Sequence, residues 1–199
     1  GGERITLAAA ASLRRVTPAL VEAFNRRHPG VEVRVTYGAS GSLRRQVEVG
    51  APVDAVLFAG SQPVDRLIEL GLARATSRRV VAANAMVLIG PPRAAALSFS
   101  LLPELSAGER LAIGDPALVP AGRYAREALQ NLGVWDKLAG RLVFGNDVTQ
   151  VLAYARRGEV EAAIVYATDL IGIDDVKVLD WAAGPWAPRP QVVAAAVGR

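Results

Sequence analysis

The sequence predicts an α/β fold of two lobes, each built on a mainly parallel sheet flanked by helices. Short apolar runs alternate along the chain with segments of helical periodicity. This alternation is typical of sheets whose crossover helices cover both faces. The 199 residues suffice for two small lobes, and a hydrophobic content of 51% is enough to bury a core in each.

The first lobe is expected to contain three strands, each followed by a helix. The expected strands are Ile5–Ala9, Val31–Tyr37 and Ala55–Phe58. The first helix is expected to run to about Arg27, with Thr17 as its cap and Pro18 at its first full position. The next two helices are marked by apolar faces, which consist of Leu43 and Val47, then of Val64, Leu67 and Ile68 before Gly71.

The rest of the chain continues the alternation and supplies the second lobe. Further strands are expected at Leu111–Gly114, Arg141–Phe144, Ala162–Val165, Val176–Val178 and Val192–Val197. The helical faces between them consist of Tyr124, Ala128, Leu129 and Leu132, then of Val148, Val151, Leu152 and Ala155. We predict lobe 1 at residues 1–81, with 180–199 returning to it, and lobe 2 at residues 82–179. The apolar segment Val80–Gly90, broken by Asn84, is the expected outward crossing, and the segment from Lys177 onward is expected to cross back.

Composition argues against several classes of protein. The net charge is +4, but the arginine pairs are scattered along the chain, so we expect no nucleic-acid partner. With no cysteine, neither a disulfide framework nor a cysteine metal site is possible. The sequence shows no signal peptide and no run long enough to span a bilayer.

Five places share one topology, in which a strand ends and a helix begins. They are centred on Ser12, Ser40, Ala121, Val148 and Tyr166. Ligands of open α/β sheets bind outside the carboxyl ends of the strands, where helix N-termini present unpaired N–H groups that suit an anion. Taken singly, each residue also has a structural interpretation: a turn or cap serine, a helix start, a core valine or a half-buried tyrosine.

Enzyme chemistry finds little support in the sequence. The single histidine, His28, lies at a predicted helix end, so a nucleophile would lack its base, and there is no phosphate-loop or dinucleotide motif. Acids do lie near strand ends, at Asp54, Asp115, Asp147 and Asp169. They could bind a hard cation, but aspartate at such positions commonly stabilises a turn or a helix start.

At these junctions the sequence resembles the molybdate-binding proteins of bacterial molybdate ABC transporters. The resemblance runs along nearly the whole chain, through Ala9–Leu13, Gly38–Leu43, Gly50–Asp54, Gly114–Ala125, Asn146–Val148 and Ile164–Tyr166. It implies a type II periplasmic binding protein, a Venus-flytrap fold with two crossing segments. It also implies that molybdate or tungstate is held by the hydroxyls of Ser12, Ser40 and Tyr166 and by backbone N–H groups of Ala121 and Val148.

The same resemblance implies further expectations. The protein is expected to be a monomer without cofactor or catalytic residues, and to deliver its oxyanion outside the cytoplasm to a membrane permease. The family continues past Val197 into a C-terminal helix that packs on the first lobe, whereas this sequence stops at Arg199, so that helix is expected to be absent. Two alternatives remain: a ligand-sensing domain of a transcription regulator, and a metal-dependent enzyme using Asp115, Asp147 and Asp169.

Overall fold

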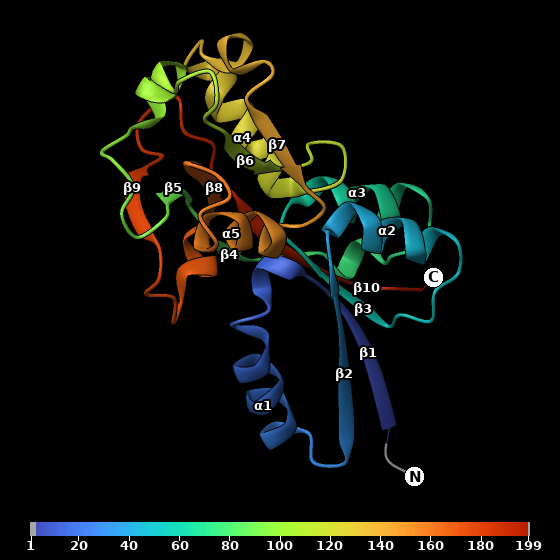
Figure 1. The fold of residues 1–199 in the computed structure, drawn as a ribbon. Coiled ribbons are helices and arrows are strands. Elements are labelled where there is room, and N and C mark those ends of the chain that lie inside the picture. The colour runs from blue at the N-terminus through green and yellow to red at the C-terminus, as the bar shows by residue number, and fades with distance from the viewer. Residues whose placement is uncertain (1–2, 199) are drawn as a thin grey trace. The chain divides into compact units, whose positions relative to one another are not determined.

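The computed structural model describes residues 3–198 and divides into two compact units (Figure 1). Unit 1 comprises the chain up to Ala83 together with the segment that starts at Gln191, and unit 2 comprises Asn84–Pro190. The chain therefore passes from unit 1 to unit 2 and returns. Each unit contains a five-stranded sheet with helices packed against it, as the sequence predicts.

Unit 1 has the strand order β2-β1-β3-β10-β4. Its strands are β1 (Glu3–Ala10), β2 (Val31–Gly38), β3 (Ala55–Phe58), β4 (Arg79–Ala83) and β10 (Gln191–Ala196). Its helices are α1 (Thr17–Arg27), α2 (Ser40–Glu48) and α3 (Ser61–Glu69). Strands β1, β2 and β3 are parallel, whereas β10 runs antiparallel to β3 and β4, so the sheet is mixed. The three parallel strands are the ones expected from the sequence.

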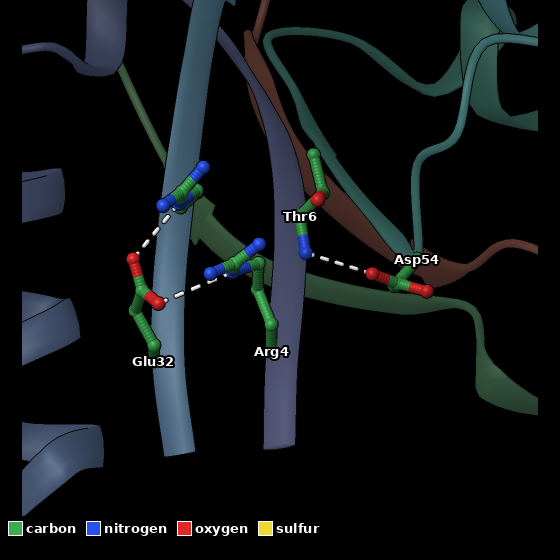
Figure 2. A network of polar contacts seen from close by, with 5 residues as sticks. Arg4, Thr6, Glu32 and Asp54 are labelled. Atoms are coloured by element: carbon green, nitrogen blue, oxygen red, sulfur yellow. Dashed lines mark hydrogen bonds and ion pairs between the residues drawn. The ribbon is translucent and has the colours of Figure 1, made fainter. Parts of the chain in front are cut away.

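Polar contacts fix the amino edge of these parallel strands (Figure 2). Glu32 accepts hydrogen bonds from Arg4, its register partner across β1 and β2, and from Arg34. Its pKa is held below the ordinary value, first by the bond from Arg34 and then by that from Arg4. The Asp54 carboxylate accepts the Thr6 N–H at 2.7 Å, while the Asp54 N–H donates to the Thr6 carbonyl, so β3 is locked to β1 at its start.

The core of unit 1 lies on one face of the sheet, under α2 and α3. It is formed by buried apolar side chains of these helices and of the strands: Ala8, Leu43, Val47, Val56, Phe58, Val64, Leu67, Ala73, Val193 and Ala195. Helix α1 borders a groove with Val35 and Tyr37, whose register partners are Leu7 and Ala9. Because neighbours in sequence along a strand face opposite sides, α1 lies on the face opposite Ala8. Only Thr17 of α1 is buried.

Unit 2 has the strand order β7-β6-β8-β5-β9. Its strands are β5 (Met86–Gly90), β6 (Leu111–Gly114), β7 (Leu142–Gly145), β8 (Ala162–Tyr166) and β9 (Lys177–Trp181). Strands β6, β7 and β8 are parallel, whereas β5 runs antiparallel to β8 and β9. Helices α4 (Pro120–Asn131) and α5 (Val148–Arg156) pack on this sheet, and β5, β6 and β8 are buried along their whole length. Within residues 3–198 no helix combines the length and apolar character needed to cross a bilayer.

The boundary at which the chain returns to unit 1 differs from the predicted residue 180. Residues 180–190 belong to unit 2, because Asp180 accepts the Phe99 N–H at 2.9 Å and Trp186 packs against the Phe99 ring at 5.2 Å between centroids. The predicted outward crossing at Val80–Gly90 is two strands, β4 and β5, which belong to different units. Asn84, where the apolar pattern breaks, is the first residue of unit 2.

Candidate ligand-binding site

Ser12 and Ser40 follow neighbouring parallel strands of unit 1. Ala10 at the end of β1 is the register partner of Gly38 at the end of β2, and each serine lies two residues further on. Ser40 is the first residue of α2, whereas Ser12 lies in a short 3₁₀ turn, Ala11–Leu13, and not at the start of α1. The register thus places both serines at the carboxyl edge of the sheet, as the sequence predicts.

The hydroxyl of Ser40 is directed across the end of β1. It accepts the backbone N–H of Ala59, at the end of β3, at 3.1 Å. Because β1 lies between β2 and β3, this bond brings Ser40 over the end of β1, where Ser12 follows. The Ser40 hydroxyl proton has no acceptor among residues 3–198, so the bond from Ala59 leaves that proton available to an anion.

The hydroxyl of Ser12 is buried and, within residues 3–198, has no hydrogen-bond partner. The residue is 3% exposed. An unsatisfied buried polar group costs about 1–3 kcal/mol, so native structures rarely retain one without a role. The turn that holds Ser12 is fixed by Thr17, whose hydroxyl donates to the Leu13 carbonyl at 2.6 Å. Thr17 is therefore not the side-chain cap of α1 that the sequence suggested: it is already helical and bonds backwards.

In unit 2, the start of α4 leaves one backbone donor free. The N–H groups of Gly122 and Arg123 both donate to the Val119 carbonyl, and Pro120 has no N–H. The N–H of Ala121 has no acceptor within the described chain, although the residue is 1% exposed. Such an orphan donor at a helix N-terminus carries part of the positive end of the helix dipole and suits an anion.

Glycines bring α4 into close contact with β6. A Cβ placed on Gly122 would lie 1.9 Å from the Gly114 carbonyl oxygen, which is far inside contact distance. Residue 122 therefore needs to be glycine for the first turn of α4 to rest on the end of β6. This contact sets where the Ala121 N–H lies relative to the sheet.

The start of α5, like that of α4, follows a strand at the carboxyl edge of the sheet, because Gly114 of β6 pairs with Gly145 of β7. Asp147 caps α5 by accepting the Gln150 N–H at 2.9 Å, and the Gln150 side chain accepts the Asn146 N–H at 2.7 Å. These bonds leave the Val148 N–H without an acceptor in the described part of the chain. Val148 itself is 2% exposed. Two orphan backbone donors thus follow adjacent strands.

Tyr166 ends β8, the strand on the other side of β6. Its side chain is buried and meets the Tyr124 ring of α4 edge-on, with centroids 6.4 Å apart. Burial raises its pKa well above the ordinary value, and the neighbouring Tyr124 and Asp169 raise it further. The phenol therefore keeps its proton at neutral pH and is a donor. A 3₁₀ turn follows it, not an α-helix.

The four aspartates considered as metal ligands accept backbone N–H groups instead. Asp115 accepts from Ala117 at 2.8 Å, Asp147 caps α5, and Asp169 accepts the Tyr166 N–H at 2.8 Å. Asp54 lies just before β3, at the amino edge of its sheet, where it accepts the Thr6 N–H (Figure 2). Among residues 3–198 no three acidic or histidine side chains gather as metal ligands would.

The five predicted residues fall into two groups. Ser12 and Ser40 come together at the carboxyl edge of the unit 1 sheet, and Ala121, Val148 and Tyr166 come together at the carboxyl edge of the unit 2 sheet. Sequence reasoning missed Ala59, which positions Ser40, and the contact of Gly122 with Gly114, which positions Ala121. The only sequence signal at these two positions is a small residue, Gly or Ala, after a strand. Such residues are too common for the sequence to show which residue each one contacts.

Two α/β units joined by two crossings, each with hydrogen-bond donors at the carboxyl edge of its sheet, define a two-lobed solute-binding protein. The chain belongs to the family described as bacterial extracellular solute-binding protein, whose model matches residues 5–198. The predicted fold class and family resemblance are thereby confirmed.

Known proteins resemble the chain at both the sequence and the structural level. The molybdate-binding protein ModA of Escherichia coli is 35% identical over 181 residues, which cover 88% of this chain and 70% of that protein. A substrate-binding domain assigned to a molybdenum ABC transporter of Clostridium difficile is 31% identical, with a TM-score of 0.71 over 98% of this chain and 84% of that one. The periplasmic molybdate-binding protein of Azotobacter vinelandii shares the fold, with a TM-score of 0.84 at 22% identity over 97% and 85%.

Proposed function

We propose that this chain binds molybdate or tungstate outside the cytoplasm and delivers it to the permease of an ABC transporter. The observation that carries the proposal is the buried Ser12 hydroxyl, unpartnered within residues 3–198, at the same sheet edge as the Ser40 hydroxyl, whose proton is available. Its sequence relatives include a molybdate-binding protein and a domain assigned to a molybdenum transporter, each more than 30% identical to this chain. We expect a monomer, in the periplasm or an equivalent extracytoplasmic space, with no catalytic step and no cofactor beyond the bound oxyanion.

In this proposal the oxyanion is held by five neutral donors. They are the hydroxyls of Ser12, Ser40 and Tyr166 and the backbone N–H groups of Ala121 and Val148. Each hydrogen bond to a charged group contributes about 1.5–3 kcal/mol. A few such bonds reach the roughly 8 kcal/mol that corresponds to micromolar affinity. All five groups act as hydrogen-bond donors in this role. An oxyanion that carries an O–H group would place that O–H against one of these donors, so its binding is disfavoured.

We take unit 1 and unit 2 as the two lobes, because the serines belong to one and the remaining donors to the other. An oxyanion that binds both sets of donors stabilises the arrangement in which the lobes close on it. The ligand shifts the equilibrium between open and closed lobes only as far as it binds the closed form more tightly than the open form. The closed form would then be the one that the permease recognises.

Calorimetry with the purified chain tests this function. We expect micromolar or tighter binding of molybdate and tungstate, and little binding of sulfate or phosphate. Sulfate bound as tightly as molybdate would refute the specificity, and no binding of any oxyanion would refute the function. Stabilisation by divalent metals alone in a thermal-shift assay would instead favour the metal-dependent alternative.

A reconstituted transporter separates delivery from sensing. A solute-binding protein should stimulate uptake of molybdate through its cognate permease, measured with a radioactive or mass-tagged oxyanion. A chain that binds molybdate tightly but never stimulates uptake would favour the ligand-sensing domain of a regulator.

A further inference from the structure

Asn84, the first residue of unit 2, makes contacts that the proposed function does not use. Its side-chain amide nitrogen donates to the Thr168 hydroxyl at 2.8 Å, and its side-chain oxygen accepts the Ala85 N–H at 3.0 Å. Its backbone N–H donates to the Pro190 carbonyl at 3.0 Å, and Pro190 is the last residue of unit 2. One side chain thus bonds both to the next residue, just before β5, and to a turn far along the chain.

The turn that contains Thr168 begins at Tyr166. Tyr166 pairs with Met86 at the start of β5, and the Ala167 N–H donates to the Ala85 carbonyl at 2.9 Å. Thr168 bonds to Asn84, and Asp169 accepts the Tyr166 N–H. Four consecutive residues are therefore fastened, three of them to the entering segment 84–86.

The Asn84–Thr168 bond is the only one of these made between two side chains. The ladder pairing ends at Met86 and Tyr166, where β8 gives way to the 3₁₀ turn. The Asn84–Thr168 bond joins the same two segments two residues beyond the end of the ladder pairing. Both side chains are half-buried, so the bond is less screened than one at the open surface.

We propose that Asn84 is a positioning residue for Tyr166: through Thr168 it ties the turn that begins at Tyr166 to the strand entering unit 2. The Tyr166 side chain is buried, and it is held in place by this backbone attachment and by its contact with the Tyr124 ring. Asn84 does not contact the oxyanion in this account. The inference rests on the proposed function, since Tyr166 matters here as a ligand donor.

Molybdate affinity, measured by calorimetry in two backgrounds, tests the inference. Asn84→Ala and Thr168→Val each break the same bond, and each should weaken binding about three- to tenfold, the range of one hydrogen bond. Thr168→Ser keeps the hydroxyl and should bind within about twofold of the wild type. Asn131→Ala, which removes an exposed side-chain bond to the Trp186 carbonyl of the same unit, is the matched control and should also stay within about twofold.

The decisive background is Tyr166→Phe. If Asn84 acts through the tyrosine hydroxyl, then Asn84→Ala should change affinity by less than about 1.5-fold once that hydroxyl is gone, because coupled residues are not additive. A general structural role would weaken binding equally in both backgrounds, and that result would overturn the inference. Should Asn84→Ala not fold, Thr168→Val tests the same bond from its other end.

Hydrogen exchange of the ligand-free protein separates this inference from the function. The Ala167 amide should exchange faster in Asn84→Ala and Thr168→Val than in the wild type and in Asn131→Ala. A wild-type protein that binds no molybdate would refute the proposed function and the ligand role of Asn84 with it. A wild type that binds molybdate, with Asn84→Ala unchanged in affinity and exchange, would refute only the inference.

Discussion

The two units contribute different kinds of donor to the proposed site. Unit 1 contributes side-chain hydroxyls, those of Ser12 and Ser40, whose orientation depends on a turn and on one bond from Ala59. Unit 2 contributes backbone N–H groups of Ala121 and Val148, fixed by the starts of two helices, together with one buried phenol. A side-chain donor can be deleted by substitution, whereas a backbone donor can only be displaced.

The sheets that carry the donors also differ in how completely their strands are buried. In unit 2 the strand β5 is buried along its whole length, with Met86, Val87, Leu88 and Ile89 at 0% exposure. In unit 1 the interior strand β1 is buried only towards its carboxyl end, and α1 buries only Thr17. Stability is distributed unevenly in such a molecule, and segments with few buried contacts open first. The backbone donors therefore stand on the more completely packed sheet.

The largest expected effect comes from deleting both hydroxyls of unit 1. Ser12→Ala with Ser40→Ala removes two hydrogen bonds to a charged ligand, about 3–6 kcal/mol, which corresponds to a loss of affinity of about 10²- to 10⁴-fold. The melting temperature of the ligand-free protein should change little, because removal of the unsatisfied Ser12 hydroxyl offsets loss of the bond that the Ser40 hydroxyl accepts from the Ala59 N–H. Calorimetry measures the first effect and thermal unfolding the second. Ser61→Ala, at the first position of α3, is the control, and unchanged affinity in the double variant would rule out the assigned serines.

The backbone donors of unit 2 can be tested through Gly122. A Cβ at this position meets the Gly114 carbonyl oxygen at 1.9 Å, so Gly122→Ala must move the first turn of α4 away from β6. We expect a loss of about 1–3 kcal/mol in the free energy of unfolding, and weaker molybdate binding because the Ala121 N–H moves. Denaturant unfolding and calorimetry measure the two effects. Gly108→Ala, where a Cβ meets no atom within 4 Å, should change neither, and equal behaviour of the two variants would contradict the close contact.

Tyr166 should give a smaller effect and a characteristic pH dependence. Tyr166→Phe removes one donor to the oxyanion, about 1.5–3 kcal/mol, and should weaken binding about 10- to 150-fold. Because burial raises the pKa of Tyr166, its contribution to stability is complete below the ordinary tyrosine pKa and is lost as the pH rises towards the raised value. Molybdate affinity should therefore be flat between pH 6 and 8, since none of the assigned donors titrates there.

Alkaline unfolding separates this prediction from a simple loss of packing. The melting temperature of the ligand-free wild type should fall more steeply between pH 9 and 11 than that of Tyr166→Phe. Tyr154→Phe, a half-buried tyrosine of α5, should follow the wild type. Identical alkaline profiles for wild type and Tyr166→Phe would mean that the phenol does not titrate as its burial requires.

The sequence predicted those parts of the fold that have a local signal. Apolar runs bounded by turn residues located strands such as β3 and β6 to the residue, and the apolar face of Leu43 and Val47 located α2. The strand-to-helix junctions also marked the five proposed site residues, because an apolar run that gives way to a helical pattern is a local signal. Their assignment to an oxyanion, however, depended on the family resemblance.

Contacts between distant residues gave no such signal. Nothing near Trp186 in the sequence indicates that it packs on Phe99, so the return boundary was placed too early. Nothing near Ser40 points to Ala59, nor does anything near Asn84 point to Thr168. Thr17 looked like a helix cap because threonine is a favoured capping residue, but its hydroxyl donates to the Leu13 carbonyl instead. Tertiary contacts decide such positions, and local pattern cannot.

The smallest expected effect tests whether charge assists the neutral donors of unit 1. Arg14, two residues after Ser12, lies over the Tyr37 ring at 4.6 Å and has no carboxylate partner among the described residues. A unit positive charge about 10 Å from a dianion in water contributes about 0.8 kcal/mol, which is up to about fourfold in association rate at low ionic strength. Stopped-flow mixing should show that Arg14→Gln slows molybdate association by this factor. At physiological ionic strength the Debye length is about 8 Å and the difference should largely vanish.

Arg27→Gln provides the matched control for this last prediction. It removes the same charge at the opposite end of α1, about 16 Å along the helix. Its association rate should stay near that of the wild type at every salt concentration. If Arg14→Gln slows association equally at low and high salt, then Arg14 acts by holding the Ser12 turn against Tyr37 and not by attracting the anion. In that case the side-chain donors of unit 1 depend on positioning contacts just as the backbone donors of unit 2 depend on Gly122.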